Sequence, residues 1–131
     1  MDNSFSLEFS FTQADVQAFA EVSRDFNPIH IDEDYAKKSI FKRRIVHGFL
    51  GASIFSRIFG TLYPGEGTIY LKQDLKFLAP MYAETLYKAV AELTEVISEK
   101  GRAKVRTYVQ DESGNIVIDG EALIQNVIFK K

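Results

Sequence analysis

The chain contains no cysteine, which excludes disulfide bonds, thiolate catalysis and cysteine-ligated zinc. It has no apolar run approaching the roughly 20 residues that span a bilayer. Its N-terminus lacks the basic and apolar regions of a signal peptide. Motif signatures of P-loop enzymes, dinucleotide-binding proteins and G-x-S-x-G hydrolases are also missing. We therefore expect a soluble cytoplasmic protein with no membrane partner.

An excess of charge of one sign is also absent. The chain has 16 Lys and Arg residues and 18 Asp and Glu residues, which gives a net charge of -2. This balance gives no reason to expect a nucleic-acid partner. The composition is that of an ordinary globular protein, with 46% hydrophobic and 26% charged residues in a chain of 131. We expect residues 1–131 to form a single domain.

The first third of the chain predicts one strand and two helices. Alternating phenylalanine and leucine over 5–11 favours a half-buried strand. Thr12 followed by Asp15 is typical of a helix start, and the helical stripe runs to about Ser23. The stretch 25–28 breaks this helix because a residue before proline is pushed out of the helical region. Asp32 is expected to cap a short helix, Glu33 to Lys38.

The remaining chain predicts one apolar helix followed by strands. The helix is expected from about Gly48 to Phe59, apolar on almost every side and therefore buried, with Gly60 as its stop. After a turn at 63–67, the pattern favours a strand ended by Pro80, and then strands at about 84–98, 102–111 and 116–129. This order predicts an α+β fold, an antiparallel sheet wrapped around a long central helix. Pairing an open sheet edge with a second copy would give a homodimer.

Asp25 and His30 are the first candidate catalytic residues. They belong to the pattern D-x-N-P-x-H, in which the proline-stiffened bend could bring the carboxylate and the imidazole toward one point. An imidazole exchanges protons near neutral pH, and a carboxylate can help to orient a water. The structural alternative is that Asp25 caps a turn and His30 satisfies local backbone groups. Asn27 lies in the same pattern and is a candidate substrate-binding residue.

His47-Gly48 opens the apolar helix and forms the second candidate group. A helix start has free amide donors, and Gly48 has no side chain to keep a carbonyl oxygen away from its N–H. Such an amide suits an oxyanion that develops on a thioester. Alternatively, Gly48 only permits close packing. His47 is expected to be structural rather than catalytic.

Other polar residues give weaker signals. Ser56 on the apolar helix either bonds its own backbone or helps to hold the Asp25–His30 pair. The two histidines, with no second histidine or cysteine near either in the sequence, are poor evidence for a metal site, and none is expected. Lys42, Arg43 and Arg44 form either a solvated loop or a contact for nucleotide phosphates.

Taken together, these motifs resemble the MaoC-like hydratases and, within them, the (R)-specific enoyl-CoA hydratases. The resemblance extends over nearly the whole chain, with its blocks in the family's order. The matching blocks are Ser23–His30, Asp32, Tyr35–Ala36, Ile45–Gly48, Ala52–Ser56 and Pro64–Leu71.

The resemblance implies a hot-dog fold, a homodimer and a hydro-lyase of fatty acid metabolism. The implied reaction is syn addition of water to a trans-2-enoyl-CoA, giving an (R)-3-hydroxyacyl-CoA. By motif matching, Asp25 and His30 become the catalytic pair, Gly48 the oxyanion donor and Ser56 a partner of the pair. No cofactor is implied, because coenzyme A enters as part of the acyl-CoA substrate.

One departure is visible, since Arg24 stands where the family usually has glycine. The alternatives that stay open are a (3R)-hydroxyacyl-[acyl carrier protein] dehydratase, a thioesterase on the same fold, and a non-catalytic acyl-CoA-binding module. Phe59 lies three residues after Ser56, on the same helix face. If that face lines the acyl tunnel, the bulk of Phe59 would favour short acyl chains.

Overall fold

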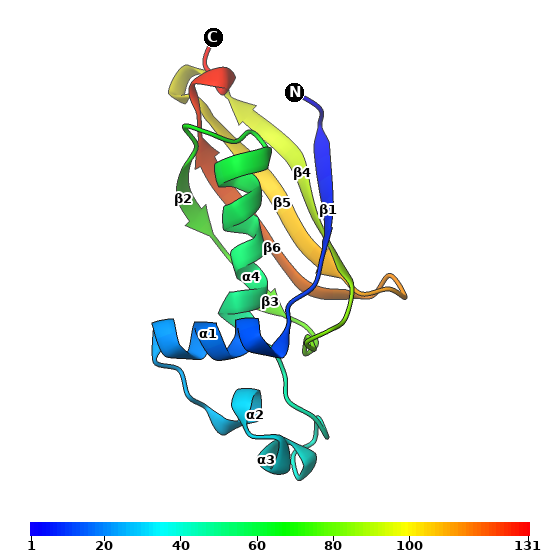
Figure 1. The fold of residues 1–131 in the computed structure, drawn as a ribbon. Helices are drawn as coiled ribbons and strands as arrows, with labels where there is room; N and C mark the ends of the chain where they lie inside the picture. Colours follow the sequence, from blue (N-terminus) through cyan, green and yellow to red (C-terminus); the bar gives the residue numbers. More distant parts are fainter.

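In a computed structural model that describes residues 1–131, an antiparallel sheet curves around one long helix (Figure 1). The sheet has six strands in the order β1-β4-β5-β6-β2, and the short β3 also pairs with β6. The strands are β1 (Ser4–Phe9), β2 (Ile69–Gln73), β3 (Lys76–Phe77), β4 (Tyr87–Ile97), β5 (Arg102–Gln110) and β6 (Ile116–Gln125). The helices are α1 (Gln13–Ser23), α2 (Pro28–Ile31), α3 (Glu33–Lys37) and α4 (Gly48–Arg57).

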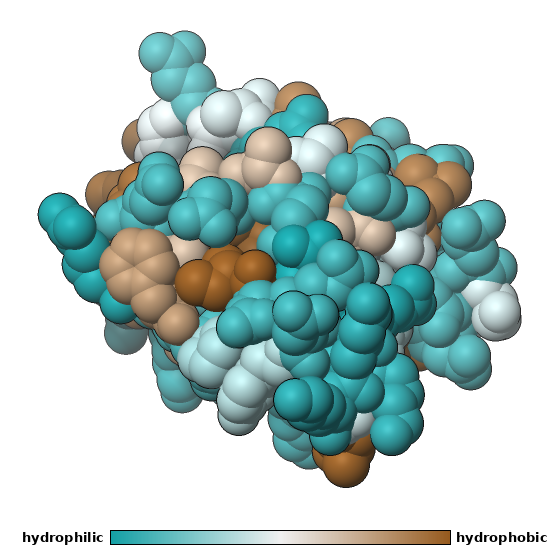
Figure 2. Space-filling view, turned by 60° about the horizontal axis from the view of Figure 1, so that its bottom comes forward, coloured by the Kyte–Doolittle hydropathy of each residue, from teal (hydrophilic) through white to brown (hydrophobic).

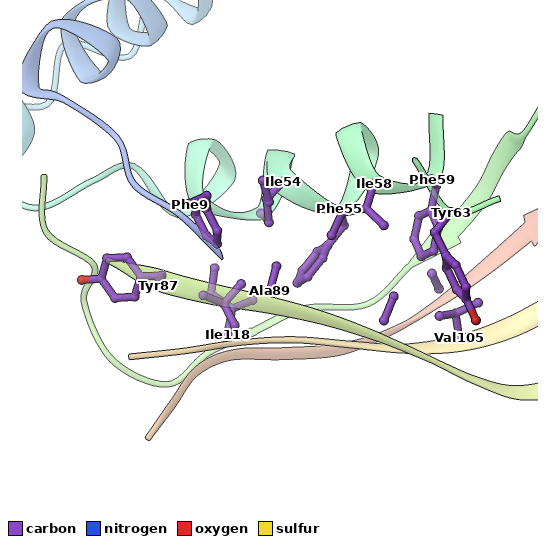
Figure 3. Packing of buried hydrophobic residues seen from close by; sticks show 14 of the residues in the cluster. Phe9, Ile54, Phe55, Ile58, Phe59, Tyr63, Tyr87, Ala89, Val105 and Ile118 are labelled. Carbon is purple, nitrogen blue, oxygen red and sulfur yellow. The ribbon is translucent and has the colours of Figure 1, made fainter. Parts of the chain in front are cut away.

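The core lies between α4 and the concave face of the sheet. Large side chains of α4, and of Ile58 directly after it, point at the strands, as Figure 3 shows for Ile54, Phe55 and Ile58. The facing strand positions include small residues, and Ala89 and Ala103 are both completely buried. A small side chain under a helix lets the backbones approach closely, so that phenylalanine rings fill the space to native packing density. The predicted wrapping of a sheet around a central helix is confirmed.

The central helix ends later than Gly60, where the sequence predicted its stop. After Arg57 the chain continues as a π-helical turn, Ile58–Leu62, and the N–H of Tyr63 still bonds the Ile58 carbonyl at 2.7 Å. The prediction of Gly60 as the stop is therefore wrong. The helical backbone ends at Leu62, two residues before Pro64, because a residue that precedes proline favours extended backbone, and Tyr63 is extended.

Two predicted strands also end differently. The run around 69–77 divides into β2 and β3, because at Asp74 a side-chain oxygen replaces the main-chain carbonyl and accepts from the N–H of Glu121 at 3.1 Å. The last strand ends at Gln125 rather than near residue 129, and a 3-10 turn follows. Asn126 causes this ending, since its buried side chain bonds Glu66 and Thr68 and caps the turn. The predicted limits of these two strands are corrected accordingly.

Strand β2 forms one edge of the sheet, and its apolar side chains are largely open. Ile69 is 53% and Leu71 41% exposed. On α4, Phe49 is exposed as well, so the expectation of a helix buried on all sides holds only for the side that faces the sheet. None of the helices has the length and apolar character needed to cross a membrane.

The segment 10–47 projects from one end of the sheet and carries α1, α2 and α3 (Figure 1). Thr12 and Asp15 form the predicted capping box of α1, and Asp32 caps α3 as predicted. Helix α2 was not predicted, although Asn27 at its N-cap and Pro28 at its first position are the usual signals of a helix start. This segment presents most of the candidate catalytic residues to the start of α4.

Candidate active site

The bend between α1 and α2 places Asp25. Helix α1 ends at Ser23, and Arg24 turns the chain with a left-handed φ of 66°. The N–H of Asp25 then donates to the Ser23 hydroxyl at 3.1 Å, and Asp25 Oδ1 accepts from the N–H of Asn27 at 3.2 Å. Asn27 in turn accepts from the N–H of Ile29 and starts α2. Local side-chain-to-backbone bonds therefore define the position of the carboxylate.

His30 lies on α2, buried with 8% of its surface exposed. Its Nδ1 lies 2.8 Å from the carbonyl oxygen of Ile45. Because a carbonyl only accepts, Nδ1 carries the hydrogen, and Nε2 is left with a free lone pair. The Gln13 amide donates to the His30 carbonyl at 2.8 Å and ties α2 to the start of α1. These bonds hold His30 as the tautomer that can accept a proton at Nε2.

His47 contributes more to the site than its sequence context suggested. Its ring stacks on His30 with centroids 3.8 Å apart, and Phe19 packs against it at 4.8 Å. His47 Nε2 donates to the main-chain carbonyl of Asp25 at 3.1 Å, while its buried Nδ1 has no partner. His47 therefore links the two predicted catalytic residues. The sequence signal was that the second of two histidines directly precedes Gly48.

The structure brings the Asp25 carboxylate and both imidazoles together. One ligand-type atom from each of Asp25, His30 and His47 lies within 4.8 Å of the other two. The lone pairs of stacked imidazoles lie in near-parallel ring planes and do not converge on one ion, and Nδ1 of His30 is already bonded to Ile45. This geometry suits proton transfer between a water and the Asp25–His30 pair better than chelation.

The surroundings of His30 determine its charge. Burial lowers the pKa of His30 from 6.5, and the charge of the neighbouring His47 lowers it further. The hydrogen bond to Ile45 and the Asp25 carboxylate act in the opposite direction but do not cancel the effect of burial. His30 is therefore mainly neutral at physiological pH, which is the state that accepts a proton.

A cavity of about 420 Å³ opens beside the imidazoles. His30, His47 and Gly48 lie on its wall, and the rest is mainly apolar: Phe41, Ile45, Val46, Phe77, Leu78, Ala79, Pro80, Met81 and Ile118. As the first residue of α4, Gly48 has an N–H without an intrahelical partner. A β-carbon at this position would come within 2.9 Å of the Phe77 ring. The site thus combines an apolar pocket, a proton acceptor and a free amide.

The other predicted site residues lie outside this cavity. Asn27 is exposed, and its side chain caps α2. Ser56 is exposed on α4, eight residues after Gly48, which corresponds to about 12 Å along a helix. Phe59 is buried in the core, with its ring edge-on to Tyr70 at 5.3 Å. The structure therefore joins Asp25, His30 and Gly48 in one site, and it leaves Ser56 and Phe59 further along the helix.

A sheet wrapped around a helix, with an acid–base pair at the helix start, defines a hot-dog fold with a site suited to hydration chemistry. The family model described as MaoC like domain matches residues 2–115. The chain is 40% identical over 121 residues to an (R)-specific enoyl-CoA hydratase of Rhodospirillum rubrum, covering 92% of this chain and 83% of that relative.

Two further comparisons are informative. A solved (R)-hydratase from Aeromonas caviae, involved in PHA biosynthesis, superposes with a TM-score of 0.91 at 38% identity, covering 94% of this chain and 93% of that one. A mitochondrial 3-hydroxyacyl-[acyl-carrier-protein] dehydratase of Arabidopsis thaliana is 35% identical, over 86% of this chain and 68% of its own length. The chain belongs to the MaoC-like family, as its motifs predicted.

Proposed function

We propose that this protein is an (R)-specific enoyl-CoA hydratase, which adds water in syn fashion to a trans-2-enoyl-CoA and forms an (R)-3-hydroxyacyl-CoA. The observation that carries the proposal is that His30 and Gly48 line one apolar pocket, with the Asp25 carboxylate close to the His30 imidazole. Two relatives that are 40% identical to this chain over most of both lengths carry this activity in their names, which supports the assignment.

The Asp25–His30 pair would hold the reacting water and move its protons. The water oxygen forms a bond to the β-carbon of the enoyl group, and one water proton passes to the pair. The pair then returns a proton to the α-carbon, so that the net change is addition of one water across the double bond. Neutral His30, with its Nε2 free, can accept that proton. Because two interacting groups share their titration, the steps belong to the pair and not to one residue.

The Gly48 amide would stabilise the charge that forms during the addition. When water attacks the β-carbon, electrons move through the conjugated system to the thioester oxygen. A fixed N–H donor at a helix start binds this oxygen more strongly in the transition state than in the substrate, and this difference accelerates the reaction. The apolar walls exclude bulk water, which strengthens the same interaction. The reaction thus needs no cofactor beyond the coenzyme A of the substrate.

The direct test is the loss of enoyl-thioester absorbance when the purified protein is given crotonyl-CoA, followed by chiral analysis of the product. We expect rapid hydration with (R)-3-hydroxybutyryl-CoA as the product. An (S) product, or no hydration, contradicts the proposal. Release of free thiol from saturated butyryl-CoA would instead indicate a thioesterase, and binding of crotonyl-CoA without turnover would indicate a non-catalytic acyl-CoA-binding module.

The acyl carrier is the second point to test. A dehydratase of 3-hydroxyacyl groups on acyl carrier protein would catalyse the same reaction in reverse, and the relative in Arabidopsis thaliana carries that name. We infer coenzyme A as the carrier because the relatives with the higher identity are named for it. A higher kcat/KM for crotonyl-CoA than for crotonyl-acyl carrier protein is expected.

We further propose a homodimer in which the apolar edge strand β2 is covered by a second copy. The exposed Ile69 and Leu71 and the exposed Phe49 of α4 support this proposal, because an apolar sheet edge left open invites pairing. Sedimentation should give twice the chain mass of 14.9 kDa. A monomer at micromolar concentration contradicts the dimer.

Phe59 remains our candidate for limiting the acyl chain, now through Tyr70. The Phe59 ring supports Tyr70, which lines a second hollow of about 360 Å³ between α4 and β2. Phe49 from this hollow and Phe77 from the first cavity pack with tilted rings, their centroids 5.9 Å apart, so the two spaces are neighbours. We expect Phe59→Leu to shift the preference toward longer enoyl-CoAs, whereas Phe55→Leu, in the same core, should not. An unchanged chain-length profile in Phe59→Leu contradicts this role. Ser56→Ala tests the role that the resemblance implied for Ser56: an unchanged kcat, as its exposed position outside the cavity favours, would remove Ser56 from the site.

A further inference from the structure

One short segment concentrates positive charge in an otherwise slightly acidic protein. Residues 36–44, Ala-Lys-Lys-Ser-Ile-Phe-Lys-Arg-Arg, include five cations and no acidic residue, whereas the whole chain has a net charge of -2. We call residues 36–44 the basic segment. It leads from the end of α3 toward α4, at the end of the molecule that carries the active site (Figure 1). Figure 2 views this end, where the surface is predominantly hydrophilic.

The basic segment is joined to the catalytic cavity. Phe41 lies within the segment and Ile45 directly follows it, and both line the cavity wall. Ile45 donates its N–H to the Ile29 carbonyl at 3.2 Å and accepts from His30 Nδ1 at 2.8 Å. The cations at 42–44 therefore lie between two residues of the pocket wall. Their main chain is fixed relative to the imidazole that would activate water.

The segment has a defined local conformation. The Ser39 hydroxyl donates to the Ala36 carbonyl at 2.6 Å and accepts from the N–H of Phe41 at 3.2 Å. Lys42 follows with its N–H bonded to the Ser39 carbonyl and a left-handed φ of 66°. A turn held by these bonds presents its cations in a preorganised array, which lowers the entropy lost on binding a ligand.

The charges of the segment are not neutralised within the chain. The ion pairs of the structure are Lys104–Glu95 and Arg106–Asp119, both elsewhere on the sheet. The Arg43 guanidinium stacks over the Tyr82 ring, with its Cζ 3.5 Å from the ring centroid. Stacking uses the face of a guanidinium and leaves its in-plane N–H donors free, and this fork matches phosphate oxygens.

We propose that the basic segment binds the phosphate groups of the coenzyme A nucleotide, with Lys42, Arg43 and Arg44 as the contacting residues. This inference rests on the proposed hydratase function. An enoyl-CoA carries its reacting thioester and its phosphates at opposite ends of one flexible arm. A cation cluster at the rim of an apolar catalytic pocket is the arrangement that such a ligand needs. The phosphates lie remote from the reacting carbons, so we take their contacts to be equally strong in the substrate and in the transition state. Such uniform binding lowers KM without raising kcat.

The test compares two substrates with the same reacting group. Crotonyl-CoA has the nucleotide, whereas crotonyl-pantetheine lacks it. In the triple variant Lys42→Gln, Arg43→Gln, Arg44→Gln we expect KM for crotonyl-CoA to rise about tenfold or more, as the loss of one or two charge-assisted phosphate contacts predicts. For crotonyl-pantetheine the KM should be unchanged, and kcat should be retained with both substrates. The KM of the wild type for crotonyl-CoA should also rise with salt, and that of the triple variant should rise less.

A matched control removes the same number of charges far from the site. Lys100, Lys130 and Lys131 are exposed at the opposite end of the sheet, where the chain terminates (Figure 1). Their triple replacement by Gln should leave both KM values unchanged. An equal rise of KM for crotonyl-CoA in this control would attribute the effect to net charge and overturn the proposal.

Three other outcomes contradict the phosphate site. An unchanged KM for crotonyl-CoA in the basic-segment variant overturns it directly. An equal rise for both thioesters means that the segment only supports the pocket. A loss confined to crotonyl-acyl carrier protein assigns the segment to a carrier protein. In each case wild-type hydration of crotonyl-CoA persists, so the failure of this site is distinct from failure of the hydratase proposal, which is the absence of any hydration by the wild type.

Discussion

The sheet with α4 and the projecting segment 10–47 are stabilised in different ways. Between α4 and the strands, burial dominates, and side chains such as Phe55, Val105 and Ile124 are completely enclosed. In the projecting segment, single side-chain-to-backbone bonds from Thr12, Ser23, Asn27, Asp32 and Ser39 define the bends. A packed core tolerates small changes in side-chain shape, whereas a bend held by one hydrogen bond is lost when that hydrogen bond is removed. The first region should therefore govern stability and the second activity.

Loss of the catalytic pair should give the largest effect on activity with little effect on folding. We expect Asp25→Asn or His30→Gln to lower kcat for crotonyl-CoA about 10²–10⁴-fold, the usual contribution of general acid–base catalysis. Asp25 is exposed, and asparagine keeps the oxygen that accepts from the N–H of Asn27, so the bend should survive. Thermal unfolding monitored by circular dichroism checks that the fold is retained. Turnover near that of the wild type in either variant would remove the pair from the mechanism.

A substitution in the core should have the converse effect, a large loss of stability with little change in kcat. Phe55 is completely buried, and Phe55→Ala should lower the free energy of unfolding by about 3–5 kcal/mol, from lost transfer energy and the cavity left behind. The fraction that remains folded should keep its kcat. Val22→Ala on the exposed side of α1 is the control, with an expected change within about 0.5 kcal/mol. A Phe55→Ala protein with unchanged unfolding in urea, or a folded one with strongly reduced kcat, would break the division between the two regions.

The same division explains what the sequence could reveal. The strands and α4 follow from hydrophobic periodicity, which reports burial; they were predicted with their ends displaced and with β2 and β3 as one strand. The π-helical turn after Arg57 and the end of β6 at Gln125 depend on Pro64 and Asn126, whose effects are local and easily outweighed by periodicity. Periodicity cannot predict α2, because four residues are too short to show it.

At the site, the sequence motifs indicated Asp25, His30 and Gly48, which the structure brings together. The sequence could not indicate the stacking of His47 on His30, because these residues are 17 apart in the chain. They meet through the hydrogen bond between Ile45 and His30 and through the packing of Phe19 against His47. Contacts of this kind depend on tertiary structure. They have no signature in the pattern of a single sequence.

His47 offers an intermediate test, because it connects the two regions. We expect His47→Phe to lower kcat about tenfold to a hundredfold by removing the donor that holds the Asp25 carbonyl while keeping a ring against His30. The pH profile distinguishes positioning from simple loss of structure. Because burial lowers the pKa of His30 from its ordinary value, wild-type kcat/KM should be level around neutral pH and fall in acidic solution.

His47→Phe and Asp25→Asn should shift the acidic limb, the fall of kcat/KM at low pH, in opposite directions. The charge of His47 lowers the pKa of His30, so the limb of His47→Phe should move to higher pH. The Asp25 carboxylate raises that pKa, so the residual activity of Asp25→Asn should show a limb at lower pH. His47→Gln, which keeps a side-chain donor, should recover part of the lost kcat. Limbs that coincide in the wild type and both variants would mean that His30 titration does not control the rate.

The smallest expected effect comes from Arg24, at the bend where the two regions differ most. Its φ of 66° lies in the left-handed region, which costs a residue with a β-carbon roughly 1–2 kcal/mol and glycine almost nothing. Glycine also loses more backbone entropy on folding, so Arg24→Gly should stabilise the protein by only about 1 kcal/mol. Arg24→Ala is the matched control, because it removes the same side chain and keeps the β-carbon. The Gly variant should melt roughly 3–5 °C above the Ala variant, with kcat unchanged in both. Equal melting temperatures would show that the bend before Asp25 is held by the Ser23 hydroxyl alone and stores no strain.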